Sequence, residues 1–574
     1  MDINLNSPPK FKNKTPLISN LFRTPMVPFR QHQVSKIMSS ANINPIIPGF
    51  APDPSLVRVA DTFFLVNSTF HMFPGLPIYA SKDLTSWSHI GKYTTRILLF
   101  HQTDLFAGNA ICRQSQLSLS LSSTHMVPVG HGETMLATGG LFAPTIRYHN
   151  GTFYVICTNV IHEEGATEDK TENFIVSTRD IYSNEWSDLV YFDFGGIDTS
   201  IFFDDATGKI FMHGSAGPGP MTKIHLFEID LETGEKLSEE KKIWDGTGGI
   251  YPEGPHIYKK DGYYYLMISE GGTHEDHSIT VARSKDIWGP YDAYENNPIL
   301  TARGTGNYIC YTGHCEFFCD GEGNWWGVCL GVRKDKGNRF IMGRESFLTT
   351  GKWPQGEWPS MTQVVPNPIL ADGKELARAK DALALTAAPG VDYLYVRDAN
   401  LSDHEFLNDG KTINLTASKA DMSQWKETIT FVGKRQRKLE AKATVSLKTS
   451  SLSKDYGLKA GLALYKDEHR FVRIFYDVTA SSMVLEVLND AKSISRVSKH
   501  DFQVKDWVYF LFEYTESSFR ASYRALKEEG WTAFDVLDTI ELTGPDFVGP
   551  VIGIFATADT GNVKVQFDDL ELDV

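Results

Sequence analysis

The fold is decided by the stretch Ala51-Pro52-Asp53-Pro54-Ser55-Leu56-Val57, because four other stretches of the chain resemble it. In each, a small or polar residue leads into an apolar segment, and a turn and an aromatic-rich strand follow. The other four are Phe142-Ala143-Pro144-Thr145-Ile146-Arg147-Tyr148, Gly196-Ile197-Asp198-Thr199-Ser200-Ile201-Phe202, Pro252-Glu253-Gly254-Pro255-His256-Ile257-Tyr258 and Gly313-His314-Cys315-Glu316-Phe317-Phe318. A unit that recurs about every 55 to 60 residues, apart from one longer gap, predicts a β-propeller rather than a solenoid.

Three of these stretches place a carboxylate at the same point of the repeat: Asp53, Asp198 and Glu253. If the leading residues of all repeats face the central axis, these three side chains converge in one pocket. Hydrolysis of a glycosidic bond needs one carboxylic acid and one carboxylate. A third negative charge nearby raises the pKa of the acid, since like charges resist joint ionisation.

Composition limits the class of protein and its partners. The chain has 574 residues, which is enough for two or more domains, and 41% of them are hydrophobic. Its net charge of −15 argues against nucleic acid or anionic membranes as partners. The sequence contains no run of 18 or more apolar residues, so it predicts no membrane span. The six cysteines match no zinc-ligand spacing. We also expect no metal ligands among the site residues and no required cofactor.

The pattern of apolar runs divides the chain into four segments and predicts an all-β protein. Residues 41–365 consist of short apolar runs broken by Gly, Pro, Asn and Asp, which predicts the propeller. Residues 366–390 are predicted as a linker, and the alternating strands of 391–574 predict a β-sandwich or jelly roll. Residues 1–40 are rich in Lys and Arg but lack the apolar core of a signal peptide, so we expect a disordered leader and a cytoplasmic protein.

The string Asn44-Pro45-Ile46-Ile47-Pro48-Gly49-Phe50-Ala51-Pro52-Asp53-Pro54-Ser55 resembles the opening of family 43 glycoside hydrolases, especially their β-xylosidase/α-L-arabinofuranosidase branch. Further similar motifs are Ser68-Thr69-Phe70, Phe142 to Tyr148, Glu253-Gly254-Pro255-His256, Glu270-Gly271-Gly272-Thr273, Gly313-His314 and Gly343-Arg344-Glu345. The resemblance runs from about Asn44 to the C-terminus. It implies a five-bladed β-propeller followed by a β-sandwich, and hydrolysis with inversion of the anomeric centre.

The resemblance also implies roles for polar residues at the matching positions. Asp53 resembles the general base that activates water, and Glu253 resembles the general acid. Asp198 is similar to the residue that tunes the pKa of the acid and orients it. Arg344 resembles an arginine that binds the sugar. His314 falls at an axial histidine that contacts ordered water or, in some relatives, the shell of a calcium ion near the axis.

Three aromatic residues are expected to bind substrate. By resemblance, Phe70 forms part of the wall of the terminal-sugar subsite. Phe142 stands where many relatives have Trp, a departure that bears on sugar preference. If the sandwich approaches the pocket mouth, Phe547 in Gly544-Pro545-Asp546-Phe547 is the aromatic that it contributes.

These residues predict an inverting exo-glycosidase that acts in xylan degradation. It would release terminal β-D-xylose, α-L-arabinofuranose or both from xylo-oligosaccharides, arabinoxylan or arabinan fragments. The alternative is a non-catalytic propeller that binds carbohydrate or protein, for which decay of the acidic triad is expected. The sequence leaves open the ratio of the two activities, the natural substrate and the oligomeric state.

Overall fold

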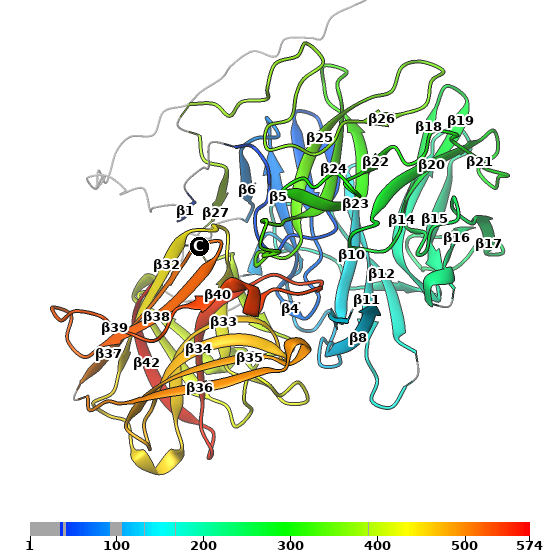
Figure 1. Cartoon of the computed structure of the whole chain (residues 1–574). Coiled ribbons are helices and arrows are strands. Elements are labelled where there is room, and N and C mark those ends of the chain that lie inside the picture. Colours follow the sequence, from blue (N-terminus) through cyan, green and yellow to red (C-terminus); the bar gives the residue numbers. More distant parts are fainter. Residues whose placement is uncertain are drawn as a thin grey trace, which may run out of the picture. The chain divides into compact units, whose positions relative to one another are not determined.

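The computed structural model describes residues 35–37, 42–91, 106–130, 132–166, 168–217, 219–380, 382–388, 390–504 and 506–573 (Figure 1). Most of the predicted leader 1–40 lies outside these residues; within it, only the backbone of strand β1 (Ser35–Ile37) is described. Among the described residues, no helix is long and apolar enough to cross a membrane.

The predicted all-β fold and the five propeller blades are confirmed. Each blade is an antiparallel sheet whose innermost strand begins at one of the five repeated stretches. Neighbouring inner strands contact one another, and the fifth contacts the first, which closes the ring. The inner strands are β2 (Ser55–Val59), β10 (Gly140–His149), β14 (Gly196–Asp204), β18 (Glu253–Lys260) and β23 (Ile309–Cys319).

The outer strands follow in chain order within every blade, as expected for up-and-down sheets. Blade 1 adds β3 (Thr62–Val66), β5 (Gly75–Ser81) and β6 (Trp87–His89), and blade 2 adds β11 (Thr152–Ile161), β12 (Lys170–Thr178) and β13 (Val190–Phe192). Blade 3 adds β15 (Lys209–Ala216), β16 (Lys223–Glu228) and β17 (Lys241–Trp244). Blade 4 adds β19 (Tyr263–Glu270), β20 (Ser278–Ser284), β21 (Asp292–Ala293) and β22 (Leu300–Thr301), and blade 5 adds β24 (Trp325–Arg333), β25 (Glu345–Lys352) and β26 (Ser360–Met361).

A side chain from each inner strand joins a polar network that connects all five blades. Ser55 Oγ donates a hydrogen bond of 2.6 Å to Glu316 Oε2, and Glu316 Oε1 lies 2.5 Å from Arg147 Nη1. Arg147 Nη2 in turn lies 3.1 Å from His256 Nδ1, which is 3.0 Å from Ser200 Oγ. These side chains bind one another across the blades, so the network helps to hold the inner strands in a fixed arrangement.

Asn44, which precedes the first blade, is hydrogen-bonded to the fifth blade. The side chain of Asn44 donates a hydrogen bond of 2.8 Å to the carbonyl of Leu348 on β25 and accepts one of 2.8 Å from its amide. Asn44 thereby continues the edge of blade 5 and helps to keep the ring closed.

The predicted β-sandwich is also confirmed, as two large antiparallel sheets with a shared apolar core. One sheet contains β28 (Tyr393–Val396), β31 (Phe431–Arg435), β33 (Lys459–Asp467), β34 (Arg470–Asp477), β35 (Ser482–Asn489), β36 (Ile494–Asp501) and β41 (Val551–Thr557). The other contains β29 (His404–Leu407), β30 (Thr412–Ala417), β32 (Ala441–Lys448), β37 (Trp507–Tyr514), β38 (Ser518–Arg524), β39 (Thr532–Ala533), β40 (Leu537–Asp538) and β42 (Val563–Leu572). Short 3-10 turns are Gly219–Met221, Leu401–Asp403, Asn408–Gly410, Lys454–Tyr456, Asp490–Lys492 and Thr539–Leu542.

Two short strands cross the expected borders between segments. Within the predicted linker, β27 (Leu385–Ala387) pairs in parallel with β6 of blade 1, and β1 pairs with β27. Within the propeller segment, β4 (Met72–Phe73) pairs with β28 of the sandwich. Both pairings occupy sheet edges that would otherwise present free backbone groups.

A hairpin of β8 (Thr124–Gly130) and β9 (Glu133–Thr138) lies between blades 1 and 2 in the chain, after β7 (Asn109–Ile111), which pairs with β5. The amide of Thr124 donates a hydrogen bond of 2.7 Å to the Glu468 carboxylate of the sandwich. The amide of Leu136 donates one of 3.0 Å to the carbonyl of Pro545, next to Phe547. The hairpin therefore contacts the sandwich loop that carries a predicted site residue.

Candidate active site

A sharp backbone bend lies in or just before every inner strand, at an equivalent position of the repeat. At this point one residue has a positive φ, and in four of the five strands a β-bulge interrupts the ladder there. Positive φ is uncommon outside glycine and concentrates at functional sites. The residues are Asp53 (50°), Ala143 (36°), Asp198 (56°), Gly254 (57°) and His314 (45°).

This geometry corrects the register predicted for Glu253. The bend aligns Gly254, rather than Glu253, with Asp53 and Asp198. Glycine suits this position because it adopts positive φ without strain. In addition, a Cβ on Gly254 would lie only 3.0 Å from His314 Nδ1. The acidic side chain therefore extends from the preceding residue of the strand.

Asp53 is buried, at 5% exposure, and its carboxyl group has two partners. Oδ2 accepts a hydrogen bond of 2.6 Å from Ser68 Oγ, and Oδ1 lies 3.3 Å from Arg344 Nη1. Burial alone raises the pKa of Asp53, but Arg344, His314 and the Ser68 hydrogen bond outweigh it, so the pKa is lowered. Asp53 is therefore a carboxylate at neutral pH and can accept a proton.

The pKa of Glu253 is displaced in the opposite direction from that of Asp53. Desolvation raises its pKa well above the ordinary value, the charges of Asp198 and Asp53 raise it further, and Arg344 offsets only part of this. Within the described part of the chain, the Glu253 carboxyl group has no hydrogen bond or ion pair, and the residue is half-buried. A raised pKa favours the protonated form of Glu253, which is the form that could donate a proton.

Asp198 contacts both the strand that carries Glu253 and the side chain of His314. Its Oδ2 accepts a hydrogen bond of 2.9 Å from the amide of Gly254 and lies 3.8 Å from His314 Nδ1. The pKa of Asp198 is raised, because burial and the charge of Asp53 together outweigh the opposite effects of His314 and the Gly254 amide. Through Gly254, Asp198 is fixed directly beside the residue that bears the acidic side chain.

Arg344, which is also buried, links the propeller to the sandwich. Besides its contact with Asp53, Nη1 donates a hydrogen bond of 3.2 Å to Thr273 Oγ1. Nε and Nη2 donate to the carbonyl of Phe547 at 3.3 and 3.1 Å. The guanidinium is therefore held in place by three segments that are far apart in the sequence.

The three predicted aromatic residues form one cluster around this guanidinium. Phe70 stacks on Phe547 with ring centroids 5.7 Å apart, and Phe142 packs edge-on against Phe70 at 4.9 Å. The Arg344 guanidinium lies 4.8 Å from the Phe547 ring centroid. Phe70 is only 1% exposed, whereas Phe142 and Phe547 are half-buried. Phe142 and Phe547 thus present surface, and Phe70 supports them from behind.

Four further residues complete the site and were not among the predicted ones. Ser68 and Thr273 lie inside motifs that the sequence already singled out, so a systematic inspection of those motifs would have found them. Ser269 Oγ accepts a hydrogen bond of 2.7 Å from the amide of His314. The ring of His277 packs against Gly313, where an added Cβ would lie 2.2 Å from the imidazole. Neither Ser269 nor His277 stands in a recognisable pattern.

The site thus combines a carboxyl group with a lowered pKa (Asp53), one with a raised pKa (Glu253), the Asp198 carboxyl group that interacts electrostatically with both, and a fixed cation beside aromatic rings. An acid and a base with separated pKa values are what general acid–base hydrolysis of a glycoside requires. Among the described residues, the one group whose atoms could share a metal ion consists of other side chains, namely His125, His162 and Asp169.

Comparison with known families agrees with this chemistry. The model of glycosyl hydrolases family 43 matches residues 43–359, which is more than half of the chain. The chain belongs to glycosyl hydrolase family 43. A second model, the beta xylosidase C-terminal concanavalin A-like domain, matches residues 389–573 of this family 43 enzyme.

Individual relatives are similar over much of the chain. A non-reducing end α-L-arabinofuranosidase of Bacteroides ovatus is 33% identical over 434 residues, which cover 74% of each chain. A xylosidase/arabinosidase of Butyrivibrio fibrisolvens is 39% identical over 330 residues, or 55% of each chain. The crystal structure of a xylan β-1,4-xylosidase from Bacillus halodurans has a TM-score of 0.77 and 25% identity, and the match covers 92% of this chain and 100% of that one. The predicted family and enzyme class are confirmed: this family 43 member is a glycoside hydrolase with a carbohydrate substrate.

Proposed function

We propose that this enzyme is an inverting exo-glycosidase that releases terminal β-D-xylose, α-L-arabinofuranose or both from xylo-oligosaccharides, arabinoxylan or arabinan fragments. The observation that carries the proposal is the placement of three acidic residues at one site: Arg344 lies 3.3 Å from Asp53, and Asp198 accepts a hydrogen bond from the amide of Gly254, next to Glu253. A lowered pKa at Asp53 and a raised pKa at Glu253 fit the roles of base and acid. The names of the similar proteins, which are xylosidases and arabinofuranosidases, support the choice of sugars.

In the proposed reaction, Asp53 accepts a proton from a water molecule as that water attacks the anomeric carbon. Glu253 donates its proton to the glycosidic oxygen as the bond between that oxygen and the anomeric carbon breaks. The sugar leaves with a new hydroxyl group on the opposite face, Asp53 is protonated and Glu253 is ionised. Proton exchange with solvent then restores both groups. Because a water molecule stands between base and sugar, the two carboxyl groups should be roughly 6.5 to 9.5 Å apart.

The neighbouring residues set the two protonation states. Arg344 keeps Asp53 ionised and is placed to bind a hydroxyl group of the sugar. Asp198 raises the pKa of Glu253, and its hydrogen bond to the Gly254 amide restrains the strand that carries the acid. His314, beside Asp198, is placed to hold a water molecule of the site.

An exo mode of action is supported by the sandwich loop at the site. The carbonyl of Phe547 fixes Arg344, and its ring packs with Phe70 and Phe142. A second domain in this position leaves less room for a polysaccharide to pass through. Phe142 and Phe547 would instead form an apolar surface for a single terminal sugar.

Turnover of 4-nitrophenyl β-D-xyloside and 4-nitrophenyl α-L-arabinofuranoside tests the proposal. We expect the wild-type enzyme to hydrolyse at least one of them, and Asp53→Ala to reduce the rate by about 10² to 10⁴-fold. Asp193→Ala is a suitable control, since its side chain is 99% exposed. Binding of xylo-oligosaccharides without any turnover would instead favour the non-catalytic propeller. More than a tenth of wild-type activity in Asp53→Ala would remove Asp53 from the role of base.

A further inference from the structure

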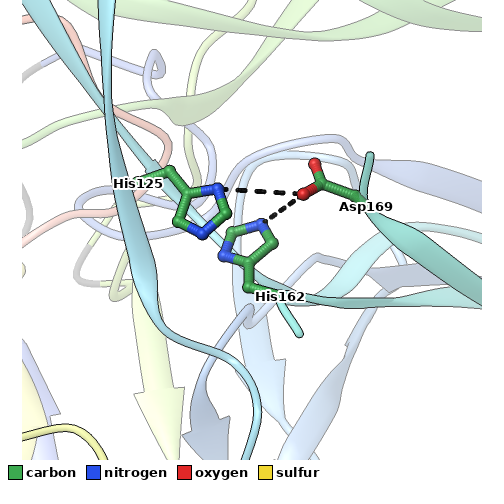
Figure 2. A group of neighbouring side chains, drawn as sticks. All are labelled: His125, His162 and Asp169. Carbon is green, nitrogen blue, oxygen red and sulfur yellow. Dashed lines mark ion pairs between the residues drawn. The ribbon is translucent and has the colours of Figure 1, made fainter. Parts of the chain in front are cut away.

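Three side chains with metal-binding atoms meet beside blade 2, apart from the residues of the proposed reaction (Figure 2). His125 lies on β8, His162 directly follows β11, and Asp169 directly precedes β12. One ligand atom from each lies within 4.8 Å of the others. Asp169 Oδ1 is 3.8 Å from His125 Nδ1 and 3.6 Å from His162 Nε2.

These separations are close to those around a bound ion. Zinc binds imidazole nitrogen and carboxylate oxygen at about 2.0 to 2.2 Å, so two ligand atoms of a tetrahedral site are roughly 3.4 Å apart. The two separations from Asp169 Oδ1 exceed this by only a few tenths of an ångström. Two imidazoles and one carboxylate also form a donor set that suits divalent transition metals rather than calcium or magnesium.

His162 is already oriented as a ligand. Its Nδ1 lies 2.8 Å from the carbonyl oxygen of Ser123. Because a carbonyl only accepts, Nδ1 carries the proton and the lone pair of Nε2 faces Asp169. Histidines that bind metals typically donate their other N–H to a carbonyl or carboxylate in this way.

The side chain of His125 must change its orientation before it can bind an ion together with His162. Its ring stacks on that of His162 with centroids 3.7 Å apart and planes 14° apart. The nitrogen lone pairs of the two rings lie in separate, nearly parallel planes and cannot meet at one point, so a shared ion requires His125 to turn about its side-chain torsions. The side chain is 48% exposed and can do so, and the 49% exposed Asp169 leaves a path from solvent.

We propose that His125, His162 and Asp169 bind a divalent transition-metal ion such as Zn²⁺, with water completing the coordination shell. The ion would tie the β8–β9 hairpin to the ends of β11 and β12. This hairpin in turn contacts two segments that carry residues of the proposed active site. The amide of Leu136 donates a hydrogen bond to the carbonyl of Pro545, two residues before Phe547, and Met135 Sδ lies 3.4 Å from Nε2 of His274, the residue after Thr273. The metal ion would therefore stabilise the β8–β9 hairpin, which contacts the Phe547 loop, and would take no part in the reaction.

Calorimetric titration of the chelator-treated full-length enzyme with Zn²⁺ tests the site. We expect about one ion per chain, and a loss of at least tenfold in affinity in His125→Ala and in Asp169→Asn. Both altered side chains are about half exposed, so these variants should fold. His469→Ala is the matched control, because it removes an imidazole 2.8 Å from Asp490 elsewhere on the surface, and its affinity should equal that of the wild type. Absence of saturable binding, or equal affinity in all four proteins, would overturn the proposal.

Amide hydrogen exchange measures whether the ion stabilises the β8–β9 hairpin, independently of catalysis. Zn²⁺ should slow amide exchange in residues 124–138 of the wild type and leave it unchanged in His125→Ala. Exchange in this hairpin that does not respond to Zn²⁺ in the wild type would refute the tethering role.

Discussion

At the residue scale, Asp53 and Glu253 carry the same functional group, yet their surroundings displace their pKa values in opposite directions. The guanidinium of Arg344 lies directly against Asp53, whereas Glu253 faces two negative charges. Activity should therefore fall at low pH as Asp53 gains a proton, and at high pH as Glu253 loses its proton. We expect the acidic limb below the ordinary pKa range of a carboxyl group and the basic limb well above it.

Asp198→Asn should move the basic limb of the pH–rate profile to lower pH. The limb reports loss of the Glu253 proton, and removal of a neighbouring negative charge makes that loss easier. Measurement of kcat/KM against pH for the wild type and the variant checks this. A lower plateau with an unmoved limb would mean that Asp198 acts through the Gly254 amide alone.

Glu253→Ala should affect substrates according to their leaving groups. Nitrophenolate departs with little protonation, so the defect on nitrophenyl glycosides should be small, whereas xylobiose should lose about 10² to 10⁴-fold in kcat/KM. Kinetics on the two substrates side by side provide the measurement. Equal defects on both would contradict the assignment of Glu253 as the acid.

At the element scale, the loop between β40 and β41 is held by a buried charge cluster. Asp546 Oδ2 lies 2.5 Å from Lys466 Nζ and 2.6 Å from Arg470 Nη2, and all three side chains are at most 2% exposed. Burial and the charge of Arg470 lower the pKa of Lys466 to about 8 even beside Asp546. The cluster thus fixes the residue next to Phe547.

Asp546→Ala should destabilise the enzyme by about 3 to 5 kcal/mol, because it leaves the buried Lys466 without its carboxylate and Arg470 with Asp467 alone. The midpoint of thermal unfolding should fall, and KM should rise as the Phe547 loop loses its anchor. Asp490→Ala, at an exposed ion pair of the same sandwich, is the control and should unfold like the wild type. An unchanged midpoint in Asp546→Ala would show that the cluster does not hold this loop.

At the scale of the whole molecule, the propeller and the sandwich share a core. Phe50, Phe70 and Met72 of the propeller segment pack with Phe431 and Phe555 of the sandwich. A fragment that ends at residue 388 would expose this apolar surface and release Arg344 from Phe547. We therefore expect it to aggregate or to lack turnover, as assayed by light scattering and with the nitrophenyl glycosides. A soluble fragment with wild-type kcat/KM would contradict the role given to the sandwich.

The fold was largely predictable because each blade repeats its own turn and aromatic strand. The short pairings of β4 and β27 were not, since two or three residues carry no periodicity. Asp53 and Asp198 could be predicted from their position in the repeat, but the register of Glu253 depends on a backbone bend that only Gly254 marks. Ser269 and His277 reach the site through contacts between distant segments, which a single sequence does not encode in any local pattern.

The stereochemistry of the first product tests the central claim, that Asp53 and Glu253 act as base and acid through one water molecule. Proton NMR spectra recorded during hydrolysis of a β-xyloside should show α-xylose appearing first, with β-xylose following only by mutarotation. Initial release of β-xylose would mean that a carboxylate attacks the sugar directly, and it would contradict the roles proposed for both residues.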